Sequence, residues 1–231
     1  MGRTGIALSV SCGLLLAGVI AFAAETRAQT AGPPADYKIV AKYTSTSPDG
    51  KTTVEQYAKI NADGDYTWQF WARRQDTLTM LEPEQPDYAA GFRFTNDSQW
   101  LVRMQKTGSG EQSLYLDRLT PRGFAAATSK PLDELAWDFF KSRPESRKIL
   151  MPDFHMVVAP LKGTEENYRW LGVDWPENRY LALTLSGDND EHGQVLSVRG
   201  WRCRYDLQRG TFDVPPEFAE HNAKAIAPEA K

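Results

Sequence analysis

Apolar and polar residues alternate with a period of two in several short stretches of the chain. Successive side chains of a strand point to opposite faces, so this period predicts strands that turn one face toward a core. The stretches are "YKIVAKYT" (37–44), "DYTWQFWAR" (65–73), "WLVRMQ" (100–105), "RYLALTLSG" (179–187) and "WRCRYDLQRGTF" (201–212). In the last stretch the expected inward residues are Trp201, Cys203, Tyr205 and Leu207, and the expected outward residues are Arg202, Arg204 and Asp206.

Turn residues join these strands into hairpins. "TGSGEQ" (107–112) separates the strand at 100–105 from "SLYLDRL" (113–119), and its glycines suit a hairpin tip. "SPDGK" (47–51) predicts another turn, because proline presets φ and Asp-Gly tolerates the positive φ that follows. Consecutive strands are therefore expected to pair antiparallel.

One segment follows helical spacing instead. In "SKPLDELAWDFFKSRP" (129–144) apolar residues recur every three to four positions, Pro131 is expected in the first turn, and Pro144 stops the helix. A shorter helix is expected within "PPEFAEHNAKAI" (215–226), whereas residues 146–164 show no clear pattern. The chain is therefore predicted to be mainly β, with antiparallel sheets and one or two helices.

Three segments with a turn followed by a strand can be aligned with one another. We call them repeat units; they are "SPDGKTTV" (47–54), "TNDSQWLV" (95–102) and "WPENRYLA" (175–182). Each has an acidic residue at its third place. The units resemble the repeat of TolB-type and WD40-like β-propellers, in which an "SPDG" turn leads into a blade strand.

The spacing of the units differs from that of a regular propeller. Their starts are 48 and then 80 residues apart, against about 40–45 for propeller blades. We therefore expect a compact antiparallel β domain with propeller-like hairpins; a small irregular β-propeller is the alternative. The mature chain also resembles a family of uncharacterised exported bacterial proteins, through "SQWLVRMQKTGSG" (98–110) and "FDVPPEFAEHNAKA" (212–225), and this resemblance implies no activity.

The N-terminus has the pattern of an export signal. Arg3 precedes a run without charges from Ile6 to Ala24, and small residues at signal-peptidase spacing predict cleavage before Ala24 or Gln29. An uncleaved membrane anchor is the alternative. We expect a signal peptide at 1–28, a flexible leader at 29–36 and a single mainly-β domain at 37–227. The protein would then be periplasmic or secreted.

Composition narrows the class of partner. The net charge is −3 and no block of basic residues occurs, which argues against nucleic acid as a partner. No apolar run after the signal reaches the roughly 18 residues of a membrane span, so we expect no transmembrane segment in the mature chain. Once the signal is removed Cys203 is the remaining cysteine, and its place on an apolar strand face predicts a buried thiol.

Neither a metal nor a cofactor is expected. In "SGDNDEHGQ" (186–194), Asp188, Asp190 and Gly193 match the first, third and sixth places of a calcium loop, but Arg199 stands where a glutamate is needed. The chain's histidines lack the spacing of zinc ligands. They are His155, His192 and His221.

The tryptophans provide the candidate binding residues. Trp68 and Trp201 lie on apolar strand faces and are expected in the core, whereas Trp71 and Trp175 are predicted to be exposed and able to contact a ligand. The sequence therefore favours an exported non-enzymatic binding module of the cell envelope, with a protein or glycan as partner. A hydrolase acting on an envelope polymer is the alternative, through carboxylates that no motif singles out.

Overall fold

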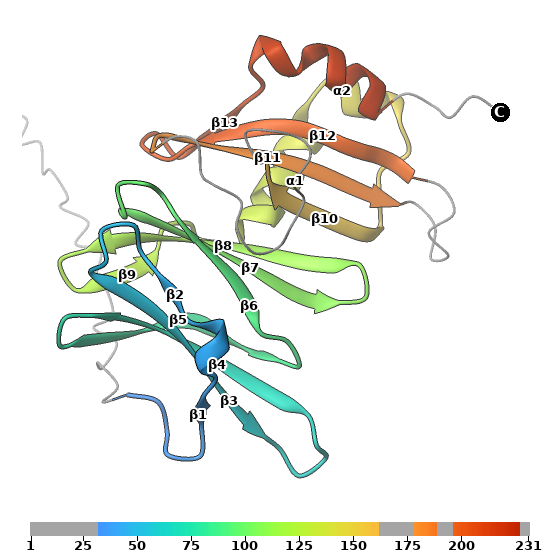
Figure 1. Cartoon of the computed structure of the whole chain (residues 1–231). Coiled ribbons are helices and arrows are strands. Elements are labelled where there is room, and N and C mark those ends of the chain that lie inside the picture. The colour runs from blue at the N-terminus through green and yellow to red at the C-terminus, as the bar shows by residue number, and fades with distance from the viewer. Residues whose placement is uncertain (1–31, 162–177, 189–195, 227–231) are drawn as a thin grey trace, which may run out of the picture.

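The computed structural model describes residues 32–161, 178–188 and 196–226, and within these ranges the chain forms three antiparallel sheets (Figure 1). Sheet A contains β1 (Lys38–Ile39), β2 (Ser45–Thr46), β3 (Thr52–Ile60), β4 (Tyr66–Arg74) and β5 (Thr77–Pro86). Sheet B contains β6 (Ala90–Phe94), β7 (Trp100–Gly108), β8 (Glu111–Thr120) and β9 (Gly123–Ala126). Sheet C contains β10 (Phe154–Pro160), β11 (Tyr180–Asp188), β12 (Leu196–Asp206) and β13 (Thr211–Asp213). The predicted mainly-β class is confirmed.

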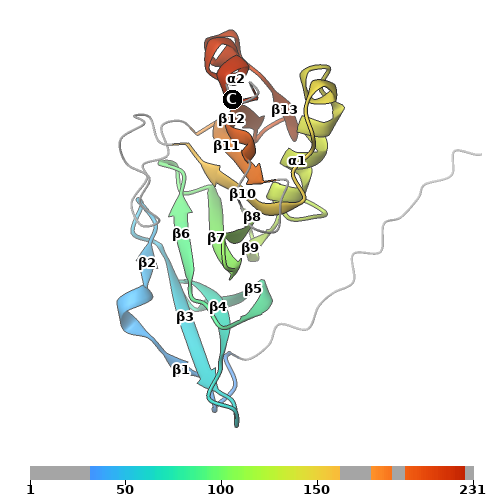
Figure 2. The same ribbon diagram turned by 90° about the vertical axis from the view of Figure 1, so that its right-hand side faces the viewer.

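Sheet B lies between sheets A and C, as both orientations show (Figures 1 and 2). One of its faces packs Phe92, Phe94 and Leu101 into a core with sheet A. The opposite face packs Val102 and Leu116 against sheet C and the first helix. Alternation along β7 therefore separates two buried faces rather than a buried face from an exposed one.

A buried arginine connects sheets A and B. Arg103 is fully buried, and its guanidinium donates hydrogen bonds to the carbonyl oxygens of Leu81, Glu82 and Pro83, at 3.0–3.1 Å. The same guanidinium lies over the rings of Phe70 and Tyr115, 4.8 and 4.0 Å from their centroids. Burial lowers its pKa to about 10, so the group stays charged at neutral pH.

Buried glutamines add further connections between the sheets. Gln56 of sheet A pairs its side-chain amide with both the N–H and the carbonyl of Ala90, at the edge of sheet B. Gln112 of sheet B donates to the carbonyl of Val158 in sheet C, at 2.9 Å. Because each bond satisfies a backbone group that would otherwise lie unpaired at a strand edge, these side chains fix how the sheets sit together.

Both predicted helices form. Helix α1 (Leu132–Ser142) begins after Pro131, which caps the helix rather than lying in its first turn, and buries Phe140 against Trp201 at 4.8 Å between ring centroids. Helix α2 (Ala219–Ala225) covers the edge of β12, where Asn222 pairs its amide with the backbone N–H and carbonyl of Arg202. The 3-10 helices are η1 (Ala41–Tyr43), η2 (Glu145–Lys148) and η3 (Pro216–Phe218).

The inward face predicted for β12 is confirmed. Trp201, Cys203 and Tyr205 are buried, and burial raises the pKa of the Cys203 thiol. Asp206 is an exception to the predicted outward set, since it is only 5% exposed. Its carboxylate accepts hydrogen bonds from the backbone N–H groups of Gln208 and Arg209, so the β12–β13 turn encloses it.

The N-terminal prediction falls largely outside the described residues. The expected signal peptide, 1–28, is not among them, and of the expected leader only residues 32–36 are. Within the described ranges, no helix combines the length and apolarity that crossing a bilayer requires.

Candidate functional site

The three repeat units occupy the same place in the three sheets. In each sheet, the strand that stands second in the pairing order begins five positions after the first residue of a unit. These strands are β3, which begins at Thr52, β7, which begins at Trp100, and β11, which begins at Tyr180. The turns of the first two units therefore lie at the same end of their sheets, which we call the turn end. The first residues of the third unit, 175–177, lie outside the described ranges.

The first unit builds its turn around a carboxylate. Asp49 Oδ1 accepts from the Ser47 hydroxyl at 2.6 Å and from the backbone N–H of Lys51 at 3.0 Å, while the Thr52 N–H donates to Ser47 Oγ at 3.0 Å. The Ser47 hydroxyl contributes most to lowering the pKa of Asp49 to about 2, and the Lys51 N–H and the Arg74 guanidinium lower it further. The carboxylate is therefore charged at neutral pH and bound within its own turn.

The second unit repeats this turn. Asp97 Oδ1 accepts from the Thr95 hydroxyl at 2.6 Å and from the Gln99 N–H at 3.0 Å, and the Trp100 N–H donates to Thr95 Oγ1 at 3.0 Å. In the first two units, a hydroxyl residue at the first place and an aspartate at the third place thus stabilise the turn through local hydrogen bonds.

The turns also bond to one another in series. The backbone N–H of Asp49 donates to Ser98 Oγ, and that of Asp97 donates to Asn178 Oδ1, each at 3.1 Å. Both donors stand at the third place of a unit, and both acceptors stand at the fourth place of the next unit. Positions that align between the units in the sequence therefore also lie at corresponding places in neighbouring sheets.

A cleft of about 390 Å³ lies at the turn end, between sheets A and B. This volume falls in the range of small-ligand sites. The β4–β5 hairpin supplies one wall, the β8–β9 hairpin another, and the second unit contributes one glutamine. The lining residues are Arg74, Gln75, Thr77, Gln99, Leu119, Thr120, Pro121 and Gly123.

Close contact between the two hairpins shapes the cleft. Gly123 has φ +110°, and a Cβ at this position would overlap the Thr79 side chain. The Thr79 hydroxyl also donates to the carbonyl of Arg122, at 3.3 Å. Glycine is required here by both the backbone angle and the close approach.

Arg74 is the charged residue among the described side chains that line the cleft. Its Nη1 donates to Thr52 Oγ1 at 2.9 Å and lies 3.5 Å from Asp49 Oδ2. The side chain is 27% exposed. Within the described part of the chain both contacts use Nη1, which leaves Nε and Nη2 for a ligand. The first turn thus holds the guanidinium in place at the wall of the cleft.

The structure corrects the prediction for Trp71. Its side chain is 1% exposed, and its indole Nε1 donates to Gln69 Oε1 at 3.1 Å, so the expected exposure is wrong. Alternation placed Trp71 on the outer face of sheet A, but it could not show that the chain before β1 passes over this face, where Gly32 lies beside Leu78. Trp175, the other predicted binding residue, lies outside the described residues.

The predicted calcium-loop positions are only partly described. Asp188 is buried, and its Oδ2 lies 3.2 Å from His155 Nδ1, whereas Asp190 and Gly193 lie outside the described ranges. Among the residues that the structure describes, no three histidine, cysteine or acidic side chains are grouped as metal ligands would be.

The cleft residues themselves were not identified from the sequence. The "SPDG" and "TNDS" turns flank the cleft, through Arg74 and Gln99, but the sequence predicted no binding role for them. The pairing of hairpins from two different sheets, however, has no local signal.

No protein-family model matches the chain, and no curated protein matches its sequence. The likeness of the repeat units to propeller repeats therefore remains a resemblance of short motifs.

Proposed function

We propose that this protein is an exported, non-enzymatic binding module of the cell envelope that holds a segment of glycan in the cleft between sheets A and B. One observation supports this proposal above the others. The cleft combines neutral hydrogen-bonding side chains with a fixed guanidinium, in a volume suited to a small polar ligand.

The chemistry of the lining suits a sugar. Carboxamides and hydroxyls both donate and accept, so Gln75 and Thr77 can match sugar hydroxyl groups in either direction. Gln99 donates one N–H to the carbonyl of Asp97, and the Thr120 hydroxyl donates to the carbonyl of Gly123, so Thr120 can only accept from a sugar. Leu119 supplies an apolar surface for the C–H face of a sugar ring. The export signal expected at 1–28 would place the protein where envelope glycans occur.

The lining favours binding over the alternative of hydrolysis. Glycoside hydrolysis uses two carboxyl groups that flank the scissile bond. The described lining has none, and the nearby carboxylates of Asp49 and Asp97 are engaged in their own turns. Asp76, exposed between the lining residues Gln75 and Thr77, has no second carboxylate in that lining to form a catalytic pair.

A tryptophan at Thr77 tests the proposal by filling the cleft. Thr77 begins β5, is half-buried and lines the cleft. Thr67, also half-buried, lies near the other end of the same sheet and provides the matched control, Thr67→Trp. Binding of soluble oligosaccharides would be measured by calorimetry on both folded variants, with circular dichroism to check the fold.

The proposal expects Thr77→Trp to abolish binding and Thr67→Trp to retain it. If the two variants bind equally well, or if the wild-type protein binds no saccharide of a broad panel, the cleft is not a glycan site.

A further inference from the structure

We infer that the ligand of this cleft carries one anionic group, a carboxylate or a phosphate on a sugar, and that Arg74 receives it. This inference rests on the proposed function and specifies its ligand.

The guanidinium is held in advance of binding. Thr52 Oγ1 and Asp49 Oδ2 both contact Nη1, so the side chain is fixed from one side while Nε and Nη2 remain for a ligand. A planar guanidinium edge matches the two oxygens of a carboxylate or phosphate and can bind them with two parallel hydrogen bonds. A side chain that is already fixed loses less conformational entropy on binding.

Asp49, the acidic residue that contacts Arg74, competes only weakly for its guanidinium. Asp49 uses Oδ1 for the Ser47 hydroxyl and the Lys51 N–H, and its Oδ2 is 3.5 Å from Nη1, which is long for a charge-assisted hydrogen bond. In contrast, Arg73 on the outer face of the same strand is bound by both oxygens of Glu55, at 2.7 and 2.9 Å. Glu55 therefore occupies the Nε and Nη2 edge of Arg73, whereas the same edge of Arg74 has no carboxylate partner among the described residues.

Charged residues at the rim of the cleft bear on how many anionic groups the ligand can carry. Arg122 is exposed and lies between the lining residues Pro121 and Gly123, so it adds positive charge. Asp76 is exposed between Gln75 and Thr77 and would repel a second anionic group. The site therefore suits a single anionic group followed by neutral hydroxyls rather than a densely charged polymer.

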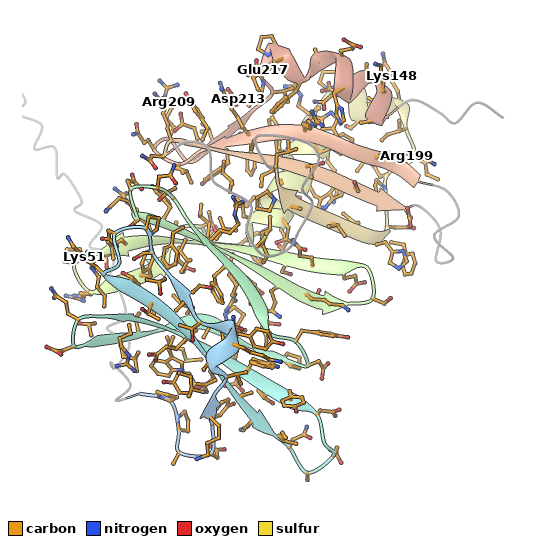
Figure 3. All side chains as sticks on the ribbon, in the orientation of Figure 1. Lys51, Lys148, Arg199, Arg209, Asp213 and Glu217 are labelled. Atoms are coloured by element: carbon orange, nitrogen blue, oxygen red, sulfur yellow. The ribbon has the colours of Figure 1, made fainter. Side chains whose placement is uncertain are left out.

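Basic side chains continue along the turn end. Figure 3 shows Lys51, in the first turn, and Arg209, in the β12–β13 turn, on the same side of the molecule. Arg209 is 3.9 Å from Asp206, whose carboxylate is enclosed by its own turn. Three carboxylates at this end, of Asp49, Asp97 and Asp206, are thus engaged in their own turns. Lys51 and Arg209 are exposed, and exposed basic side chains attract anions.

Three probes test the inference on the mature protein by calorimetry: a galacturonic acid trisaccharide, glucose 6-phosphate and a neutral glucose trisaccharide. We expect at least one anionic probe to bind more tightly than the neutral trisaccharide by about tenfold or more, since the pairing is charge-assisted. The anionic probe that binds identifies the carboxylate or the phosphate as the group.

Two variants with the same change in charge separate Arg74 from general electrostatics. Arg74→Gln should remove the preference for the anionic probe, whereas Arg73→Gln, on the opposite face of β4, should keep it. Asp49→Asn removes the acidic partner of Arg74 but leaves Thr52 to hold it, so anion binding should persist or strengthen.

The possible failures are distinguishable. If anionic and neutral saccharides bind equally and Arg74→Gln changes neither, the inference is wrong and the proposed glycan site stands. If Arg74→Gln and Arg73→Gln weaken anion binding alike, the preference reflects net charge and the assignment to Arg74 is wrong. If no probe binds and Thr77→Trp has no effect on any saccharide, both the inference and the proposed function fail.

Discussion

The backbone N–H of Asp97 donates a hydrogen bond to Asn178 Oδ1 at 3.1 Å, joining two turns that lie 81 residues apart in the sequence. The bond between Asp49 and Ser98 is its counterpart one sheet earlier. These two bonds occupy the same places of successive repeat units, so they bring the turn ends of all three sheets into one surface. The cleft between sheets A and B is part of that surface.

We predict that Ser98→Ala destabilises the protein. Ser98 is fully buried, and its hydroxyl is the acceptor for the Asp49 N–H. Loss of that acceptor should lower the free energy of unfolding by about 1–3 kcal/mol. Urea denaturation of Ser98→Ala, with the exposed hairpin residue Ser109→Ala as control, measures the effect. Equal midpoints for the two variants would show that the bond between the turns does not stabilise the fold.

Arg103→Met should lower the free energy of unfolding by more than Ser98→Ala does. It leaves the carbonyl oxygens of Leu81, Glu82 and Pro83 without their donor and removes the positive charge that interacts with the buried Asp117. A hydrogen bond from a charged group typically contributes about 1.5–3 kcal/mol to stability. The double variant Arg103→Met with Asp117→Asn should recover part of this loss in denaturant unfolding. No recovery would indicate that the carbonyl bonds alone account for the role of Arg103.

Asp117 should make stability depend on pH. Burial raises its pKa from 3.8 to about 6, and the positive charge of Arg103 opposes this shift only in part. The folded state therefore holds a proton that the unfolded state has lost between pH 4 and 6, so this contribution to stability is full below pH 4 and declines as pH rises through 6. Asp117→Asn lacks the ionisation. It should match the wild type near pH 4 and exceed it by roughly 2–3 kcal/mol at pH 7.

Unfolding free energies of the wild type and Asp117→Asn, measured at pH 4, 5, 6 and 7, test this directly. A constant difference across the series would show that Asp117 does not titrate in this window.

Local patterns in the sequence predicted much of the fold. Alternation identified the apolar face of β12 with Cys203, the glycines located the β7–β8 tip, and the two prolines bounded α1. The alignment of the repeat units predicted where β3, β7 and β11 begin, one strand in each sheet. Each of these features depends on residues close together in the chain.

Features that depend on contacts between sheets could not be predicted in this way. Arg103 occupies a strand position that alternation leaves open, and only the stacking of sheet A on sheet B buries it. Trp71 was misassigned because alternation within β4 could not show that the chain before β1 passes over the outer face of sheet A. Arg74 and Thr120 meet at the cleft because two hairpins from different sheets approach each other, and no spacing in the sequence signals that approach.

The central claim is that ligand binds at the turn end, in the cleft between the first two sheets. Amide chemical-shift mapping during titration with the galacturonic acid trisaccharide tests it most directly. The account predicts that the amides of Gln75, Thr77, Gln99 and Thr120 shift, while those of Gly110 and His155, at the other end of the sheets, do not. Shifts confined to Gly110 and His155 would contradict it.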